Sequence, residues 1–183
     1  MELILKPFNV YDWKNLEKWV SNELELIQFA GTIFSFPVDQ KQVENYLLDS
    51  NREVFRVETR NNQIIGMAEM SLEANNVAKL SRVLIGENTI RGKGIGTELI
   101  KKMITYAFEK PEVNRIVLNV YSWNIGAIKC YKKVGFYQSD KPMTDIWVGN
   151  DRWKIIEMEI RRDDFCNKNF DKKIYTEGFN NKK

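Results

Sequence analysis

Histidine is absent from the 183-residue chain, which excludes every mechanism built on an imidazole base and most zinc sites. Cysteine occurs only at Cys130 and Cys166, with no CxxC pair, and isolated cysteines of this kind fit a reducing compartment. No apolar run approaches the length of a membrane span, and the N-terminus has an early acid, Glu2, that a signal peptide would lack. These absences predict a cytoplasmic protein with no metal and no membrane partner.

A pronounced excess of either charge is also missing, because 28 basic residues against 25 acidic ones leave a net charge of +3. A nucleic-acid-binding protein would show a basic stripe with interleaved aromatic residues. Only the C-terminal tail offers a weak version of such a stripe, so we predict no nucleic-acid partner. Hydrophobic residues make up 43% of the chain, which is a folding composition, and the length suits one domain with a sizeable core.

The spacing of apolar residues divides the chain into short strands and amphipathic helices. Strand patterns cover residues 3–5, 53–58, 64–73, 77–85, 115–121, 136–137 and 153–160. Helical patterns cover residues 12–20, 23–30, 39–47, 95–110 and 124–134. Asp12 and Asp39 stand where N-caps are expected, and Gln42 completes a plausible capping box. We therefore predict one domain over residues 1–162, with an antiparallel meander at 53–85, followed by a polar tail at 163–183.

The most informative stretch is a glycine-rich turn at the entrance of the predicted helix 95–110. It consists of Arg91, Gly92, Lys93, Gly94, Ile95 and Gly96. Glycine lets the backbone approach a ligand closely, and the free N–H groups and dipole of a helix N-terminus favour negative charge. The two basic side chains add counter-charge, so the turn predicts a site for a phosphate chain.

Two better-known phosphate motifs fail on their spacing. A P-loop requires four residues between its glycines and then Gly-Lys-Ser/Thr. Here five residues separate Gly86 from Gly92, and Gly94 takes the place of the hydroxyl residue that would hold magnesium. A dinucleotide fingerprint that starts at Gly92 would need glycine at position 97, which is Thr97. Neither nucleotide-binding fold is therefore predicted.

A second segment, 28 residues beyond Gly96, places Asn124, Ala127 and Tyr131 at helical spacing and continues to Gly135-Phe136. The two segments together resemble the GCN5-related N-acetyltransferase (GNAT) superfamily. In that family the first segment has the form Q/R-x-x-G-x-G/A, and the second runs Asn, Ala, Tyr and then Gly-Phe. The resemblance covers about residues 3–160, and the pairing of the two segments at this separation is its specific part.

The resemblance implies an α/β (α+β) fold, a single domain whose central mixed, mostly antiparallel sheet of about six to seven strands is flanked by helices. It also implies an enzyme that moves an acetyl group from acetyl-coenzyme A (acetyl-CoA) to a primary amine by direct attack, with no metal. The early helices look most like the branch that modifies ribosomal-protein N-termini and polyamines. The expected partner is then a small-molecule or peptide amine, and a homodimer remains open.

Roles follow for the residues that match the family pattern. Backbone N–H groups of residues 91–96 are expected to bind the pyrophosphate, and Asn124 the cofactor arm. The end of the preceding strand, Val83, Leu84 and Ile85, is expected to pair with the pantetheine arm as an added strand and to steady the oxyanion through a backbone N–H. Tyr131 is the expected general acid for the leaving thiolate.

The general base is less clear, because several relatives carry Glu in the middle of the fifth strand and this chain has Asn119 there. Glu69 or Glu73 on the earlier strand are substitutes, acting through water, although both also fit solvent-facing strand positions. The acceptor is expected between residues 12–50 and the loop around 140–152. A catalytically silent module that senses acyl-CoA is the alternative function, and a required acid at Tyr131 would separate the two.

Overall fold

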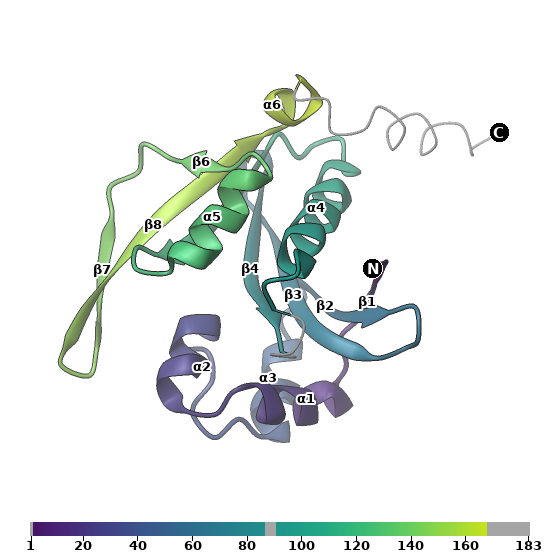
Figure 1. Ribbon diagram of the computed structural model, residues 1–183, viewed down its shortest axis with the longest axis vertical. Helices are drawn as coiled ribbons and strands as arrows, with labels where there is room; N and C mark the ends of the chain where they lie inside the picture. Colours follow the sequence, from purple (N-terminus) through teal and green to yellow (C-terminus); the bar gives the residue numbers. More distant parts are fainter. Residues whose placement is uncertain (1, 87–90, 168–183) are drawn as a thin grey trace.

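The computed structural model describes residues 2–86 and 91–167, which form an eight-stranded mixed sheet (Figure 1). Its strands run in the order β1-β2-β3-β4-β5-β8-β6, with β7 paired to β8 off this path. Their bounds are β1 Leu3–Pro7, β2 Arg52–Thr59, β3 Ile64–Glu73, β4 Val77–Ile85, β5 Arg115–Tyr121, β6 Tyr137–Gln138, β7 Thr144–Val148 and β8 Asp151–Arg161. Among these described strands, only the β4–β5 pair is parallel. The predicted fold class and the antiparallel meander β2-β3-β4 are confirmed.

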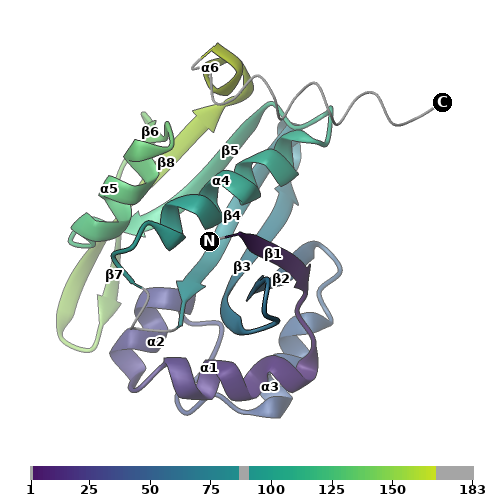
Figure 2. The same cartoon turned by 45° about the vertical axis from the view of Figure 1, so that its right-hand side comes forward.

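The helices are distributed unevenly about the sheet. Their bounds are α1 Trp13–Trp19, α2 Glu23–Ala30, α3 Gln40–Leu47, α4 Ile95–Phe108, α5 Ile125–Lys133 and α6 Arg162–Asn167, with 3-10 turns at Val10–Asp12 and Ala74–Asn76. Figures 1 and 2 show α4 and α5 side by side over the sheet, whereas α1, α2 and α3 gather at one end, beside the C-terminal end of β4.

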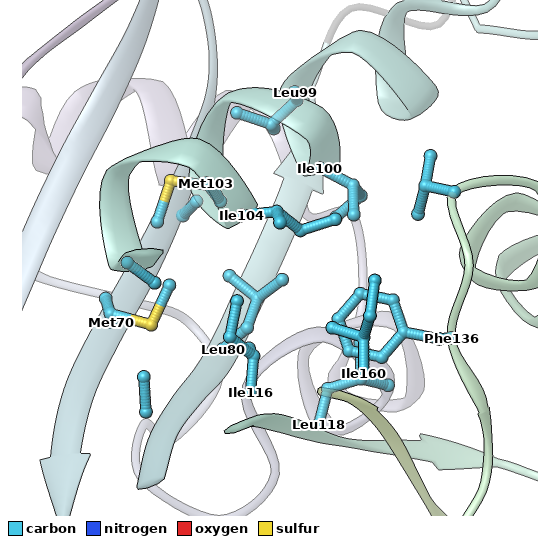
Figure 3. Close-up of a cluster of buried hydrophobic side chains, with 14 of the residues drawn as sticks. Met70, Leu80, Leu99, Ile100, Met103, Ile104, Ile116, Leu118, Phe136 and Ile160 are labelled. Carbon is cyan, nitrogen blue, oxygen red and sulfur yellow. The ribbon is translucent and has the colours of Figure 1, made fainter. Parts of the chain in front are cut away.

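Two hydrophobic clusters hold these layers together. The larger one lies between α4 and the central strands, where the apolar stripe predicted for α4 faces the sheet (Figure 3). Leu99, Ile100, Met103 and Ile104 of α4 are all at most 1% exposed, because β3, β4, β5 and β8 cover them with the side chains of Met70, Leu80, Ile116, Leu118 and Ile160. The smaller cluster joins α1, α2 and α3 to β2 and β3 around Leu16, Val43 and Met67.

The two residues predicted as helix N-caps, Asp39 and Asp12, differ in the hydrogen bonds that their side chains make. Asp39 accepts a hydrogen bond from the Gln42 backbone at 2.8 Å, as an N-cap should. Asp12 stands at the predicted N-cap position of α1, but its side chain makes no capping bond to that helix, because a 3-10 turn precedes α1 and Asn9 caps this turn. Asp12 instead accepts from the Asn9 backbone N–H at 2.9 Å and closes a capping box.

Two elements were not predicted from the sequence. Strand β7 forms a hairpin with the first half of β8, which brings the sheet to eight strands instead of about six to seven. Helix α6 lies at the start of the predicted tail, and its Phe165 is buried against Phe108 of α4 with ring centroids 5.5 Å apart. Residues 168–183 of that tail lie outside the described residues, so the boundary after residue 162 stays a prediction.

Candidate active site

The sheet opens between its two parallel strands. β4 and β5 pair only from Val77–Leu80 to Arg115–Leu118, and beyond these residues no register is shared. A cleft of about 640 Å³ occupies the opening, between the C-terminal half of β4 on one side and Asn119 to Tyr121 of β5 on the other. Backbone groups that a continuous ladder would have paired therefore face a cavity.

A β-bulge on β4 shapes one wall of this cleft. The register with β3 shifts between Met67 and Glu69, so that the β4 residues Arg82 and Val83 fall outside the regular pairing. Arg82 adopts φ = 48°, in the left-handed region that non-glycine residues avoid. The bulge turns the end of the strand along the cleft, and all three predicted strand residues, Val83, Leu84 and Ile85, line it.

The glycine turn lies at the end of the same cleft. Gly92 and Gly94 have φ values of 78° and 83°, and an added Cβ at either would meet nothing within 4 Å. Backbone conformation, and not lack of space, therefore requires glycine at both positions. Arg91 and Gly96 line the cleft, and the Arg91 side chain donates from Nε to the Ile85 carbonyl at 2.8 Å. This bond ties the turn back to β4.

The four other turn residues do not line the cleft. Ile95 begins α4 and is buried in the larger hydrophobic cluster, so its side chain packs in the core. Lys93 and the two left-handed glycines, Gly92 and Gly94, are also absent from the cleft lining. Gly94 is the N-cap residue of α4 and has no side chain to satisfy the free N–H groups of the first turn.

Asn124 caps the second helix of the site. Its Oδ1 accepts from the Ala127 backbone N–H at 3.1 Å, as the side chain of an N-cap residue does. Asn124 and Ala127 both line the cleft. Because the amide oxygen is used in the cap, the amide nitrogen is the group of Asn124 that can contact a ligand.

Tyr131 lies one turn further along α5 and also lines the cleft. Its ring meets Phe136 edge-on, with centroids 6.0 Å apart, which fixes the direction of the half-buried side chain. Burial, followed by the neighbouring Cys130, raises the pKa of Tyr131 well above that of a free phenol. The hydroxyl therefore carries its proton at neutral pH. Cys130 itself lies 3.5 Å from the Thr97 hydroxyl of α4.

Glu69 is not solvent-facing, and that interpretation of its strand position is wrong. The residue is 3% exposed, and one oxygen, Oε2, accepts from the Tyr46 hydroxyl and from Arg82 Nη1, the latter at 2.5 Å. The Arg82 guanidinium also lies over the Tyr46 ring, 5.4 Å from its centroid. Burial and the adjacent carboxylate raise the pKa of Tyr46. Glu69 does not line the main cleft, whereas Arg82 does. Glu73 is exposed, as expected.

The remaining walls come from the N-terminal helices and β5. Tyr121 of β5 donates from its hydroxyl to the Ile27 carbonyl at 3.2 Å, which fastens α2 to the sheet. Asn119 lines the cleft, so the structure places an amide there. Trp153 lies outside the lining and meets the ring of Tyr121 edge-on, with ring centroids 4.9 Å apart. Trp147 is 72% exposed and lies outside the lining.

The described part of the chain contains no group of three or more histidine, cysteine, aspartate or glutamate residues arranged to hold a metal ion. It also contains no helix that is both long and apolar enough to cross a membrane.

Known proteins share this architecture and parts of the sequence. The chain is 26% identical over 148 residues to an N-acetyltransferase 9-like protein of Nematostella vectensis, covering 74% of each protein. It is 42% identical over 45 residues to an aminoglycoside N(6')-acetyltransferase of Klebsiella pneumoniae, which is 25% of this chain and 22% of that protein. The solved spermidine N-acetyltransferase of Vibrio cholerae, in complex with CoA and spermine, superimposes with a TM-score of 0.75 at 19% identity, covering 90% and 98% of the two chains.

The model of the acetyltransferase (GNAT) family matches residues 13–136, which include the opening of the sheet, the glycine turn and α5. The resemblance inferred from the two sequence segments is thereby confirmed, and with it an enzyme of the acetyltransferase class. The chain belongs to the acetyltransferase (GNAT) family.

Proposed function

We propose that the protein transfers an acetyl group from acetyl-CoA to a primary amine by direct attack, with Tyr131 as the general acid. The observation that carries this proposal is the composition of the single cleft between β4 and β5. It brings a glycine turn at a helix N-terminus, a strand edge that β5 leaves unpaired and a half-buried, protonated phenol together in one cavity.

Each part of the cofactor has a matching part of the cleft. The free N–H groups at the start of α4, with Arg91 beside them, suit a pyrophosphate. β5 leaves one edge of β4 unpaired at Val83–Ile85, whereas β3 pairs with the other edge. Apart from the Ile85 carbonyl, which accepts from Arg91, this edge offers backbone donors and acceptors to an amide-containing arm such as pantetheine, as an added strand would receive them. The amide nitrogen of Asn124 contacts the same arm from α5.

The chemistry then proceeds in one addition and one elimination. The amine nitrogen attacks the thioester carbonyl, and a backbone N–H on the β4 edge stabilises the negative oxygen that forms. The C–S bond then breaks, the acetyl group stays on nitrogen, and the sulfur leaves as a thiolate. The Tyr131 hydroxyl donates its proton to that sulfur, which gives free CoA. The proton lost by the amine passes to solvent, and the Tyr131 phenolate takes a proton back from solvent before the next turnover.

The cleft is poor in groups that could take the proton from the amine. Among the described residues that line it, Glu25 is the only carboxylate, and its Oε2 accepts from the Ser21 backbone N–H at 2.9 Å. Asn119 cannot act as a base. An α-amino group has a pKa of about 8 and an alkylamine about 10.4, so deprotonating the second costs roughly 3 kcal/mol more. The site therefore suits an α-amine better than a lysine-like amine.

The decisive test compares Tyr131→Phe with the wild-type protein, with Tyr137→Phe as the matched control. Tyr137 lies on β6, outside the cleft, and its hydroxyl donates to Glu159 of β8. We expect Tyr131→Phe to bind acetyl-CoA with unchanged affinity and to release CoA thiol at least about tenfold more slowly in the presence of amine. The control should retain both properties.

The acceptor panel contains peptide N-termini, free amino acids, polyamines and aminoglycosides, since named relatives act on spermidine and aminoglycosides. Unchanged turnover in Tyr131→Phe would remove this residue from the chemistry. A wild-type protein that binds acetyl-CoA and acetylates none of these amines would instead be a non-catalytic acyl-CoA-binding module.

A further inference from the structure

We propose that the acceptor is an α-amine with a carboxylate close to it, as in a peptide that begins with an acidic residue, and that Lys79 and Arg82 bind this carboxylate. The inference deepens the proposed function and rests on it. It follows from a second cavity, from the charges that remain unpaired there, and from the scarcity of carboxylates in the main cleft.

The second cavity, of about 340 Å³, continues the main cleft on the far face of the sheet. Lys79, Ser81 and Arg82 of β4 line both spaces. Leu80, between the first two, points into the core beneath α4, so Lys79 and Ser81 lie on the opposite face of the strand. A cofactor held beside α4 and α5 would then receive its acceptor from this opposite face, through the opening between β4 and β5.

Most charges around the second cavity are already paired. Asp49 forms an ion pair with Arg52 at 2.6 Å, and Glu69 forms one with Arg82. Glu73 is exposed and accepts from the Ser71 hydroxyl at 3.1 Å, so solvent screens its charge. These pairs cancel most of the charge that the wall would otherwise present to a ligand.

Two donors remain where the cavities meet. Lys79 is half-buried and forms no ion pair or side-chain hydrogen bond within the described residues. Arg82 Nε is buried without an acceptor, although its Nη1 is bound by Glu69. A buried N–H without an acceptor is unfavourable, and a carboxylate supplies acceptor oxygens and negative charge for both groups.

The main cleft also lacks what a polycation would need. Its described lining contains three basic residues, Lys79, Arg82 and Arg91, and one carboxylate, Glu25. Spermidine and kanamycin carry several positive charges, which this lining would leave without partners. An acidic peptide places its α-amine toward the opening and its carboxylate toward Lys79, and its α-amine has the low pKa that a cleft without a strong base requires.

The test uses two C-terminally amidated dipeptides that differ by one carboxylate, Asp-Ala-amide and Asn-Ala-amide, with CoA release as the readout. We expect the wild-type kcat/KM to be about tenfold higher for the Asp peptide. Lys79→Gln should remove most of this preference, because it should lower kcat/KM for the Asp peptide far more than for the Asn peptide. Lys101→Gln is the control, because Lys101 pairs with Glu98 on α4 outside the cleft and should retain the full preference.

The remaining outcomes separate this inference from the proposed function. Equal rates for the two peptides, a preference that survives in Lys79→Gln, or faster acetylation of spermidine or kanamycin would overturn the carboxylate site while the acetyltransferase proposal stands. Faster acetylation of phosphoserine-Ala-amide than of the Asp peptide would also overturn it, by identifying phosphate as the bound anion. Failure to bind acetyl-CoA would overturn the proposed function, and the inference with it.

Discussion

Replacing Glu69 by alanine should destabilise the protein strongly, because it removes the acceptor that Arg82 and Tyr46 share. The Glu69 side chain is 4% exposed and that of Arg82 16%, so the remaining guanidinium would be left mostly buried with no counter-charge. Breaking a buried pair in this way costs about 3–5 kcal/mol. For a domain of this size that corresponds to a fall in Tm of roughly 6–20 °C. We expect Glu69→Gln to lose less, since its amide oxygen still accepts a hydrogen bond.

Thermal and urea unfolding of the single and double variants provides the measurement. In Glu69→Ala/Arg82→Gln the uncompensated charge is gone, so the combined loss should be at least about 2 kcal/mol smaller than the sum of the two single losses. Additive losses, or a loss below about 1 kcal/mol in Glu69→Ala, would refute the buried-pair argument.

Turnover in Glu69→Gln tests the catalytic assignment separately. If Glu69 acts by holding Arg82 and the bulge in β4, kcat should stay within about fivefold of wild type, whereas a general base would cost 100-fold or more. A stable Glu69→Gln variant that loses turnover to that extent, with an altered pH profile, would restore the role of base predicted from the sequence.

Two further predictions concern residues that stabilise the fold: Gly86, beside the cleft, and Glu58 on β2. Gly86→Ala would place a Cβ 2.0 Å from the ring of Trp19, which lines the cleft, so it should lower Tm and raise the acceptor KM. Glu58 has a lowered pKa because Lys6 donates to it, and Arg56 adds to the effect. The folded pKa lies below the ordinary value of 4.5, so its stabilisation is present above that pH and is lost as the pH falls through the lowered pKa. Urea unfolding across this range should show a steeper acid loss for wild type than for Glu58→Gln.

The sequence predicted the elements whose apolar spacing is long and regular. The stripe of α4 and the meander β2-β3-β4 fall where the pattern placed them, because burial on one face of a helix or strand leaves a periodic trace in the sequence. Gly92 and Gly94 of the turn could be recognised for a related reason, since positive φ strongly favours glycine.

What could not be predicted depends on contacts between distant residues. β7 is short, and its Trp147 is exposed, so only its pairing with β8 makes it a strand. The burial of Glu69 depends on Tyr46, 23 residues earlier, and on Arg82, 13 residues later. The bulge itself leaves no trace in composition, because it places a non-glycine residue, Arg82, at positive φ. The second cavity could not be predicted for the same reason, because Glu69 and Arg82 form part of its wall.

The position of the site, in contrast, follows from chain order once β4 and β5 are known to be parallel. A parallel pair requires a crossover, and the chain between Ile85 and Arg115 supplies it as the glycine turn and α4. The turn must then begin at the C-terminal end of β4, where the strands have already separated. Only residues 122–124 separate the end of β5 at Tyr121 from the start of α5 at Ile125, so Tyr131 is brought to the same opening from the other side. The glycine turn, the edge of β4 that β5 leaves unpaired and the phenol therefore meet, because the turn follows β4 and α5, which carries Tyr131, follows β5.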